Sequence, residues 1–446
     1  MTEKWTNLEE SWEILDPLSD PYVGIIRRES NKLHDIDGIW LYSYGAQVTD
    51  SSIIFGVPSN PFNGGGSPNP AAARLAALGE TVERYSATYC PSPGEDVVYT
   101  TQKDLIDKGE LVIGYDSWEL FAPEQYADPN FPYDIWDENT ELWWTKGTDA
   151  KTNRPVWTPA SLLYMIGKWD GDAYLADATS NGLACGIQPI EAAINGLLET
   201  VERDAFMLTW YNKLSLPLID IQSSPRLVEF FKRYIDPTFL EVNLVDMTIF
   251  SGIPTVLAVV RNTKNEIAPI GLGASSAASL EIACEKAASE AMYTRSWGKM
   301  ETRKKTHLYT NDYNADINDF SDHIKLFIRP DMIKETEFLT SSKKRVSLNK
   351  YKSFNDKTPQ DLWDDLTQHL FSLGFNVATF DLTSPDIRDA GASVIKTLIP
   401  KFRPLDVTYR GRMLGGERLR SHAYNLGLVK EKFDFEDFNP TPHPFP

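Results

Sequence analysis

The chain has 446 residues, and its 63 Asp and Glu against 44 Lys and Arg give a formal net charge of −19. This balance argues against a nucleic acid or an anionic membrane surface as the main partner. The three cysteines, Cys90, Cys185 and Cys284, are widely spaced and form no CxxC pair. They therefore indicate neither a disulfide scaffold nor a zinc knuckle, and they fit a reducing cytosol.

The first 60 residues mix short apolar runs with turn residues. The opening stretch MTEKWTNLEESWEILD lacks the pattern of a signal peptide, and no later apolar run reaches the roughly 18 residues of a membrane helix. We therefore expect a soluble, cytoplasmic protein. Residues 53–57 are predicted to form a strand, and the glycine-rich segment 61–70 is predicted to form a loop. The helix that follows has Pro70 in its first turn and contains the pentapeptide ETVER at residues 80–84.

The middle of the chain repeats this pattern of a loop followed by a helix. Residues 90–160 are predicted to form irregular loops with short strands. A helix of about 20 residues is expected from Pro189, and it contains a second ETVER at residues 199–203. Two strands around a turn at 262–265 lead into a third helix near 277–297. Together with the mixed elements of the last third, this predicts an α/β (α+β) fold over 1–446, with candidate lobes 1–160 and 161–430 and a proline-rich tail at 431–446.

The repeated pentapeptides place carboxylates on two helix faces. Residues three or four apart share one face of a helix, so Glu80 and Glu83 form one polar stripe. A second stripe consists of Glu191, Asn195, Glu199 and Glu202, and the side chains opposite it are apolar. Enclosed carboxylates are costly unless something compensates their charge. A hard divalent cation is the natural compensator, and Mg²⁺ with phosphate oxygens needs only one or two protein carboxylates per ion.

Other interpretations stay open at the level of spacing. ETVER also suits an ordinary solvent-facing helix, and Arg84 and Arg203 either pair with neighbouring glutamates or present a planar donor fork to a phosphate. Lys286 and Glu290, four residues apart, form an ordinary surface ion pair unless the third helix joins the other two. The glycine-rich segment lacks the Gly-Lys-Ser/Thr of a Walker loop, and none of the six histidines shows a metal-ligand spacing.

Three longer segments carry a family resemblance. ALGETVERYSA, ATSNGLACGIQPIEAAINGLLETVERDAF and GLGASSAASLEIACEKAASEAM resemble, in order and separation, the signature segments of the YcaO family. The resemblance extends from roughly residue 20 to the end of the chain. It implies a YcaO-like fold in which mixed sheets and packed helices enclose an ATP and Mg²⁺ site that is built without a Walker loop.

The resemblance also implies roles for individual residues. Those implied for magnesium are Glu80, Glu83, Glu191, Glu199 and Glu202, and those implied for the nucleotide are Arg27, Arg84, Ser180, Asn181, Arg203, Lys286 and Glu290, with Glu290 also a metal candidate. Two positions depart from the family pattern. Ala76 stands where a serine is usual and Thr294 where a glutamine is usual, and either change can alter nucleotide binding.

The end of the chain points to one branch of the family. Residues 440–446, PTPHPFP, resemble the PxPxP ending of azoline-forming YcaO cyclodehydratases of the D-protein type. Such an end is otherwise usually disordered, although prolines can also make a stiff strand that holds a terminal carboxylate at a fixed point. The branch implies ATP-dependent cyclodehydration of Cys, Ser or Thr in a ribosomally made precursor peptide, as in the biosynthesis of thiazole/oxazole-modified microcins and bacteriocins. The carboxylate of Pro446 is then the candidate general base.

The implied partners and the alternatives follow from the same resemblance. No leader-binding module is evident in the sequence, so a separate partner related to ubiquitin-activating enzymes is expected to deliver the peptide. A flavin-dependent dehydrogenase is a further expected partner, which oxidises azolines to azoles. Thioamide or amidine formation is one alternative, against which the tail argues. A non-catalytic YcaO-like scaffold that binds nucleotide or peptide in a synthetase complex is another, motivated by Ala76 and Thr294.

Overall fold

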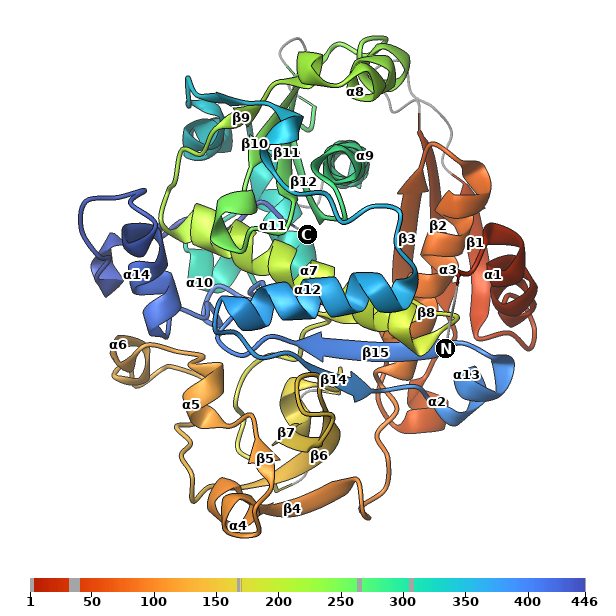
Figure 1. Ribbon diagram of the computed structural model, residues 1–446, viewed down its shortest axis with the longest axis vertical. Coiled ribbons are helices and arrows are strands. Elements are labelled where there is room, and N and C mark those ends of the chain that lie inside the picture. The colour runs from red at the N-terminus through yellow and green to blue at the C-terminus, as the bar shows by residue number, and fades with distance from the viewer. Residues whose placement is uncertain are drawn as a thin grey trace.

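In the computed structural model, the described residues are 4–31, 41–166, 169, 171–262, 267–304 and 309–445. They form three separate β-sheets and three long helices that lie between the sheets (Figure 1). The long helices are α3 (Pro70–Ser86), α7 (Pro189–Tyr211) and α9 (Leu280–Lys304). This arrangement confirms the predicted fold of mixed sheets and packed helices. None of the described helices combines the length and the apolar character needed to cross a membrane.

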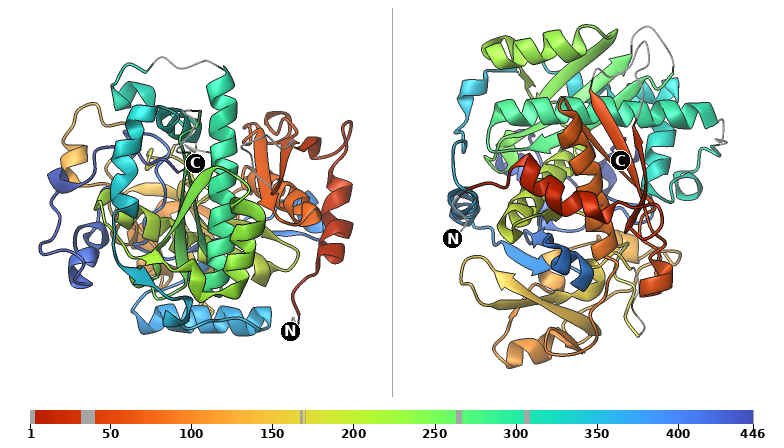
Figure 2. Two further views of the ribbon diagram at one scale, coloured as in Figure 1. Left: turned by 90° about the horizontal axis from the view of Figure 1, so that it is seen from above. Right: turned by 90° about the vertical axis from the view of Figure 1, so that its right-hand side faces the viewer.

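The first sheet is antiparallel and belongs to the N-terminal part of the chain. Its strands are β1 (Ile26–Asn31), β2 (Tyr42–Val48) and β3 (Phe62–Ser67), in that order. Helix α3 covers it, and α1 (Leu8–Leu15) packs on α3. Both views in Figure 2 show α9 running beside this sheet, where it contacts β3.

The second sheet is covered by α9. Its strand order is β12 (Ile270–Ser276), β11 (Thr255–Asn262), β10 (Leu240–Asp246), β9 (Leu218–Ile219) and β13 (Arg345–Val346). The third sheet runs β5 (Leu111–Val112), β7 (Pro155–Pro159), β6 (Glu141–Asp149), β14 (Ala378–Asp381), β15 (Ser393–Leu398) and β8 (Leu183–Gly186), and β4 (Val97–Thr101) also pairs with β6. Because β6 pairs with β14, this sheet joins residues from both candidate lobes.

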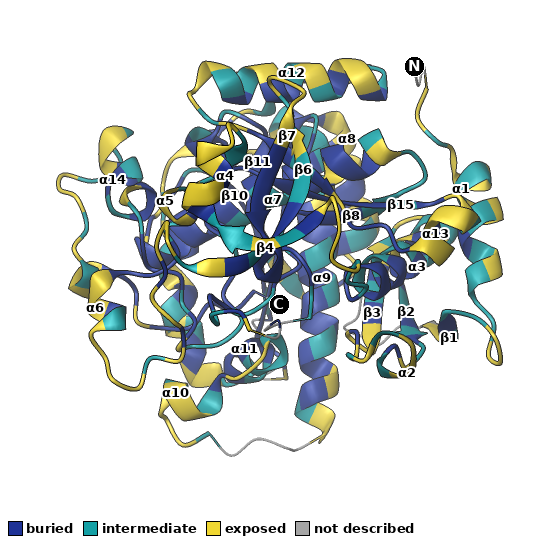
Figure 3. Ribbon diagram, turned by 90° about the horizontal axis from the view of Figure 1, so that it is seen from below, coloured by how far each residue is buried: buried dark blue, intermediate teal, exposed yellow. Residues whose placement is uncertain are grey.

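Helix α7 lies at the centre of the molecule and contacts β8 and β15 of the third sheet and β11 and β12 of the second. Figure 3 shows buried residues along the central strands and exposed residues on α12 and α1 at the surface. The remaining helices are α2 (Ser52–Phe55), α4 (Gln102–Asp107), α5 (Tyr115–Trp118), α6 (Pro123–Tyr126), α8 (Pro225–Phe230), α10 (Tyr313–Asp316), α11 (Phe320–Phe327), α12 (Pro359–Ser372), α13 (Pro385–Ala390) and α14 (Glu417–Asn425).

Local sequence explains where the long helices begin. The Asn69 side chain accepts hydrogen bonds from the backbone N–H groups of Ala71 and Ala72, and Pro70 follows at the first helical position. Pro189 occupies the same position in α7. A proline there loses no helical hydrogen bond and already has a helical φ angle. The predicted starts of both helices are therefore confirmed.

Two local predictions in the N-terminal part are wrong. Residues 53–57 do not form a strand, because residues 52–55 form the short helix α2. The segment 61–70 is not a loop throughout, because residues 62–67 form strand β3. Glycines are needed there because neighbours approach from both faces. A Cβ atom on Gly64 would lie 1.8 Å from the Tyr293 hydroxyl oxygen, and one on Gly65 would lie 2.4 Å from the Ala73 carbonyl oxygen.

Candidate active site

The three long helices present acidic residues at equivalent positions. A glutamate stands ten residues after the first residue of each helix, at Glu80 after Pro70, Glu199 after Pro189 and Glu290 after Leu280. The positions three and four residues further on are Glu83 and Arg84 in α3, Glu202 and Arg203 in α7, and Tyr293 and Thr294 in α9. Each helix follows a strand, which is β3, β8 or β12. We call Glu80, Glu83, Glu199, Glu202 and Glu290 the acidic cluster.

Backbone N–H groups of the strands hold three of these carboxylates. The Gly64 N–H of β3 donates to Glu80 Oε2 at 2.7 Å. The Ala274 N–H of β12 donates to Glu290 Oε2 at 2.9 Å, and the Ser276 N–H donates to Glu202 Oε2 at 3.2 Å. The sheets thus fix the direction of the carboxylates, because each strand lies directly against the helix that follows it or against α7.

Each arginine of the repeated pentapeptide bridges the two glutamates of its own helix. Arg84 lies 3.4 Å from carboxylate oxygens of both Glu80 and Glu83. Arg203 lies 3.4 Å from oxygens of Glu199 and of Glu202. These side chains keep only a small to moderate accessible surface, from 11% for Glu202 to 32% for Glu80, so they face an internal space and not bulk solvent.

The carboxylates from the three helices act on one another electrostatically. Burial raises the pKa of Glu83 and of Glu202 well above the usual value of a carboxyl group, and Glu199 contributes to both shifts. Burial also raises the pKa of Glu199, with Glu80 adding to that shift. The pKa of Glu290 rises to about 7 for the same reason, and Glu199 and Glu80 again contribute. Residues from distant parts of the sequence therefore converge on one site, as the repeated pentapeptide suggested.

Several residues expected near the nucleotide lie beside the cluster. Asn181 lines a cavity of about 40 Å³ together with Arg203 and Lys396, and its Oδ1 accepts a hydrogen bond from the Leu405 N–H at 3.1 Å. Ser180 precedes it and is buried. Lys286 belongs to α9, where desolvation of its amino group lowers its pKa and Glu202 opposes that shift.

Two expected site residues, Glu191 and Arg27, bind other partners in the structure. The Glu191 carboxylate accepts hydrogen bonds from Thr6 N at 2.6 Å and Thr6 Oγ1 at 2.8 Å, and it caps the start of α7. Eight residues of helix separate it from Glu199, which corresponds to about 12 Å. Arg27 donates to Thr49 Oγ1 at 3.1 Å and to the Tyr22 carbonyl oxygen.

The proline-rich tail is buried through its last described residue. Phe445 has no exposed surface, and its ring lies 4.5 Å from the Arg203 guanidinium carbon and 4.9 Å from the Phe206 ring. Upstream, the His443 ring stacks on His323 at 4.0 Å, and its carbonyl oxygen is 2.8 Å from His323 Nδ1. Through Phe445 the tail therefore packs against Arg203 and Phe206 of α7. Pro446, the candidate general base, lies outside the described residues.

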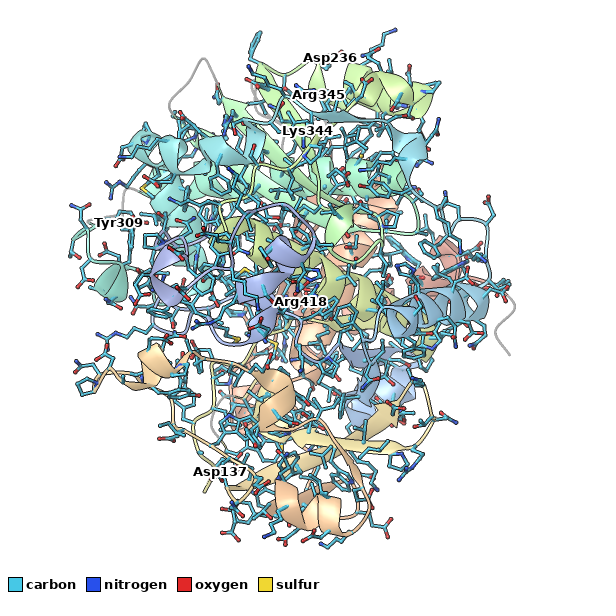
Figure 4. The ribbon with its side chains drawn as sticks, turned by 60° about the vertical axis from the view of Figure 1, so that its left-hand side comes forward. Asp137, Asp236, Tyr309, Lys344, Arg345 and Arg418 are labelled. Atoms are coloured by element: carbon cyan, nitrogen blue, oxygen red, sulfur yellow. The ribbon has the colours of Figure 1, made fainter. Side chains whose placement is uncertain are left out.

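The position of α7 is fixed by a buried ion pair next to Arg203. Asp204 accepts hydrogen bonds from Arg418 at 2.8 and 2.5 Å, and its Oδ1 also accepts the Arg403 N–H at 3.0 Å. Arg418 belongs to α14, and Figure 4 shows it near the middle of the molecule, unlike Asp137 and Asp236 toward its two ends. Arg403 and Arg418, both buried, are thus partners of α7.

One buried cation was not anticipated from the sequence. Lys396 in β15 is only 2% exposed and donates hydrogen bonds to three backbone carbonyl oxygens. Burial lowers its pKa to about 7, against the opposing effect of Glu199. The signal in the sequence was a single lysine within the apolar run ASVIKTLIP, because lysine is rarely buried unless it is paired.

The chemistry of the site fits a nucleotide with magnesium. Five carboxylates offer hard oxygen ligands. Burial disfavours the ionised forms of Glu83, Glu199, Glu202 and Glu290, so a cation would stabilise them. Within the described ranges, no three His, Cys, Asp or Glu side chains are arranged to coordinate one ion on their own. An ion that also binds phosphate oxygens needs only one or two carboxylates from the protein.

Comparison with known proteins identifies relatives of this arrangement. Residues 63–403 match the model of a family described as YcaO cyclodehydratase, ATP- and Mg²⁺-binding. An uncharacterized protein of Methanothermobacter thermautotrophicus is 24% identical over 349 residues, which cover 75% of this chain and 80% of the relative.

Solved structures share the fold. A heterocyclase in complex with substrate and cofactor has a TM-score of 0.79 at 22% identity, and the match covers 100% of this chain but 58% of the heterocyclase. The YcaO protein of Methanopyrus kandleri bound with AMPPCP and Mg²⁺ has a TM-score of 0.61 at 18% identity, with 89% and 91% covered. The E. coli microcin synthetase McbBCD complex with pro-MccB17 bound has a TM-score of 0.54 at 12% identity, with 90% and 91% covered.

Proposed function

The chain belongs to the YcaO family, and from this premise we propose that it catalyses ATP-dependent cyclodehydration. The substrate is a ribosomally synthesised precursor peptide, in which Cys, Ser or Thr residues become thiazolines or oxazolines. The observation that carries this proposal is the convergence of carboxylates from three helices, and of Arg84 and Arg203, on one internal site, with Phe445 of the tail against Arg203.

The proposed reaction needs ATP because the oxygen that must depart is a poor leaving group. The side-chain thiol or hydroxyl loses its proton to the general base and adds to the preceding backbone carbonyl. The carbonyl-derived oxygen then takes the γ-phosphoryl group of ATP, and ADP is the leaving group. Phosphate then departs as the amide nitrogen loses its proton and the ring C=N bond forms, so that one water is lost overall. Bound Mg²⁺ would supply charge neutralisation at the phosphoryl group.

The residues divide the work of holding the reactants. Glu80, Glu83, Glu199 and Glu202 are the proposed metal ligands, and the bridging arginines keep these carboxylates apart from one another until phosphate oxygens arrive. Arg84 and Arg203 then have a planar donor fork available for phosphate.

The proposed nucleotide contacts are Ser180, Asn181, Lys286 and Glu290 in addition to the arginines. Pro446 stays the proposed general base. In support, Phe445, which directly precedes it in the sequence, is buried against Arg203.

We propose that a separate, ubiquitin-activating-enzyme-like protein delivers the leader of the precursor peptide. This chain spans about 58% of the length of the heterocyclase whose fold it shares. The microcin synthetase is instead a complex with its pro-peptide, and its matched chain is of similar length. A flavin-dependent dehydrogenase is the proposed later partner, and all of these are proposed to act in the cytoplasm.

Reconstitution tests the proposal. The protein is mixed with a Cys- or Ser/Thr-containing precursor peptide, the partner and Mg-ATP, and the peptide is weighed by mass spectrometry. Loss of one water per modified residue together with phosphate release is expected. Binding of nucleotide or peptide without mass loss would instead favour the scaffold, for which Ala76 and the buried, unpartnered hydroxyl of Thr294 remain the motive. A gain of sulfur in place of water loss would favour thioamide formation.

A further inference from the structure

All three amino protons of Lys396 are donated to backbone carbonyl oxygens of the protein. Its amino group donates to the carbonyl oxygens of Leu162, Leu163 and Thr179 at 3.2, 3.1 and 2.7 Å. An ammonium group has three donors and no acceptor, so three carbonyl acceptors match the charged form. No proton is left for a ligand, and a direct contact between Lys396 and a substrate is not part of its role.

The Thr179 carbonyl oxygen, at 2.7 Å the shortest of the three contacts, belongs to the residue just before two proposed nucleotide contacts. Thr179 directly precedes Ser180 and Asn181. The next residue of β15 ties down the same segment, since the Thr397 N–H donates to the Gly182 carbonyl oxygen at 2.7 Å. Two consecutive residues of one strand therefore hold residues 179–182 from both ends.

The same ammonium group lies close to the acidic cluster. Glu199 and Glu83 both act on Lys396 electrostatically, and so does Arg84. Lys396 and Arg203 line the same small cavity, beside Asn181. A buried positive charge behind two carboxylates reduces the cost of keeping them ionised, and the cost is large in a low-dielectric interior.

We propose that Lys396 is a positioning residue that fixes the segment 179–181 against β15 and so sets the positions of Ser180 and Asn181 at the nucleotide site. The link to nucleotide rests on the proposed function. The holding of the segment does not, so the two parts can be measured separately.

The test compares Lys396→Met with a matched control, Lys146→Met. Lys146 lies in β6 of the same sheet, but it pairs at 2.9 Å with Asp96, whose side chain is 77% exposed. Hydrogen exchange is followed by mass spectrometry in peptides that span residues 177–183, and the affinity for Mg-ATP is measured by calorimetry. Lys396→Met leaves three carbonyls unpaired, so we expect about tenfold faster exchange in this segment and about tenfold weaker Mg-ATP binding. Lys146→Met should change neither.

A second variant keeps the inference falsifiable if Lys396→Met does not fold. Lys396→Gln retains two donors without the charge, and it should give intermediate effects. Unchanged exchange in residues 177–183, or an unchanged Mg-ATP affinity despite faster exchange, overturns the positioning role. Failure of both variants to fold also overturns it, in favour of a purely structural lysine. If the unmodified protein binds no Mg-ATP but the variants exchange faster, the proposed function fails and the holding of the segment stands.

Discussion

The substitution Glu290→Gln separates two effects of the acidic cluster: the loss of folding stability that its buried charge causes, and its contribution to Mg-ATP binding. In the folded protein burial raises the pKa of Glu290 from 4.5 to about 7, while the Ala274 N–H and Arg203 only partly oppose the shift. Each pKa unit corresponds to about 1.4 kcal/mol, so the ionised carboxylate costs the folded state about 3 kcal/mol. A glutamine side-chain oxygen can still accept the Ala274 N–H and carries no charge.

The difference in stability between the variant and the original protein depends on pH. A carboxyl group whose pKa is higher in the folded than in the unfolded chain destabilises the fold as pH rises through that interval, here from about 4.5 to about 7. Below that interval both states bind the proton and the substitution should change little. Above it, the variant should be more stable than the original protein by up to about 3 kcal/mol. The difference in urea midpoint between variant and original, measured at pH 4 and at pH 8, tests this.

The same variant should bind Mg-ATP more weakly, because the cluster loses a negative charge that the cation would compensate. Glu191→Gln is the matched control, since Glu191 caps α7 through Thr6 and lies outside the acidic cluster. It should lower the urea midpoint at both pH values and leave Mg-ATP affinity unchanged. A Glu290→Gln protein that is less stable than the original at pH 8, with full Mg-ATP affinity, would refute the idea that these carboxylates await a cation.

Further predictions concern turnover, the metal and the tail. Glu199→Gln or Glu202→Gln should abolish cyclodehydration with the circular dichroism spectrum unchanged; full activity in both would contradict their assignment. Chelation with EDTA should abolish ATP binding measured by calorimetry, and ATP binding that persists would exclude metal bridging. Phe445→Ala should lower stability to urea by about 3 to 5 kcal/mol, as expected for a buried aromatic ring, with cyclodehydration impaired more than nucleotide binding. Phe445→Leu should restore most of the stability, and equal loss of nucleotide binding and turnover in both variants would remove the tail from the chemistry.

The long helices and their meeting point were predictable from the sequence. Pro70 and Pro189 mark helix starts by a local rule, and the spacing of glutamates and arginines defines helix faces without knowledge of the fold. The apolar residues opposite the second stripe further required that the charged face meet protein. Each of these inferences uses only neighbours within a few residues, and each is confirmed.

Sequence-based prediction was least successful where residues distant in the sequence determine the local structure. Gly64 and Gly65 have low intrinsic strand propensity, yet they form β3 because α3 and Tyr293 approach too closely for any side chain. Glu191 shares a helix face with Glu199, but residues near the start of the chain bind it first. Lys396 gives only a weak signal, since the three carbonyls that make its burial tolerable come from residues more than 200 positions away.

The repeated ETVER motif alone does not identify every helix that contributes to the site, as α9 shows. At the positions of the second glutamate and the arginine, α9 carries Tyr293 and Thr294, so a search for ETVER finds two helices and misses the third. Glu290 nevertheless occupies the equivalent helix position and is held by a strand N–H, as Glu80 is. Tyr293 uses its position differently: its hydroxyl oxygen lies against Gly64, and so joins α9 to the sheet beneath α3. Helix α9 thus carries fewer charges than α3 and α7, which limits the repulsion among the buried carboxylates while each helix still places one carboxylate at the equivalent position.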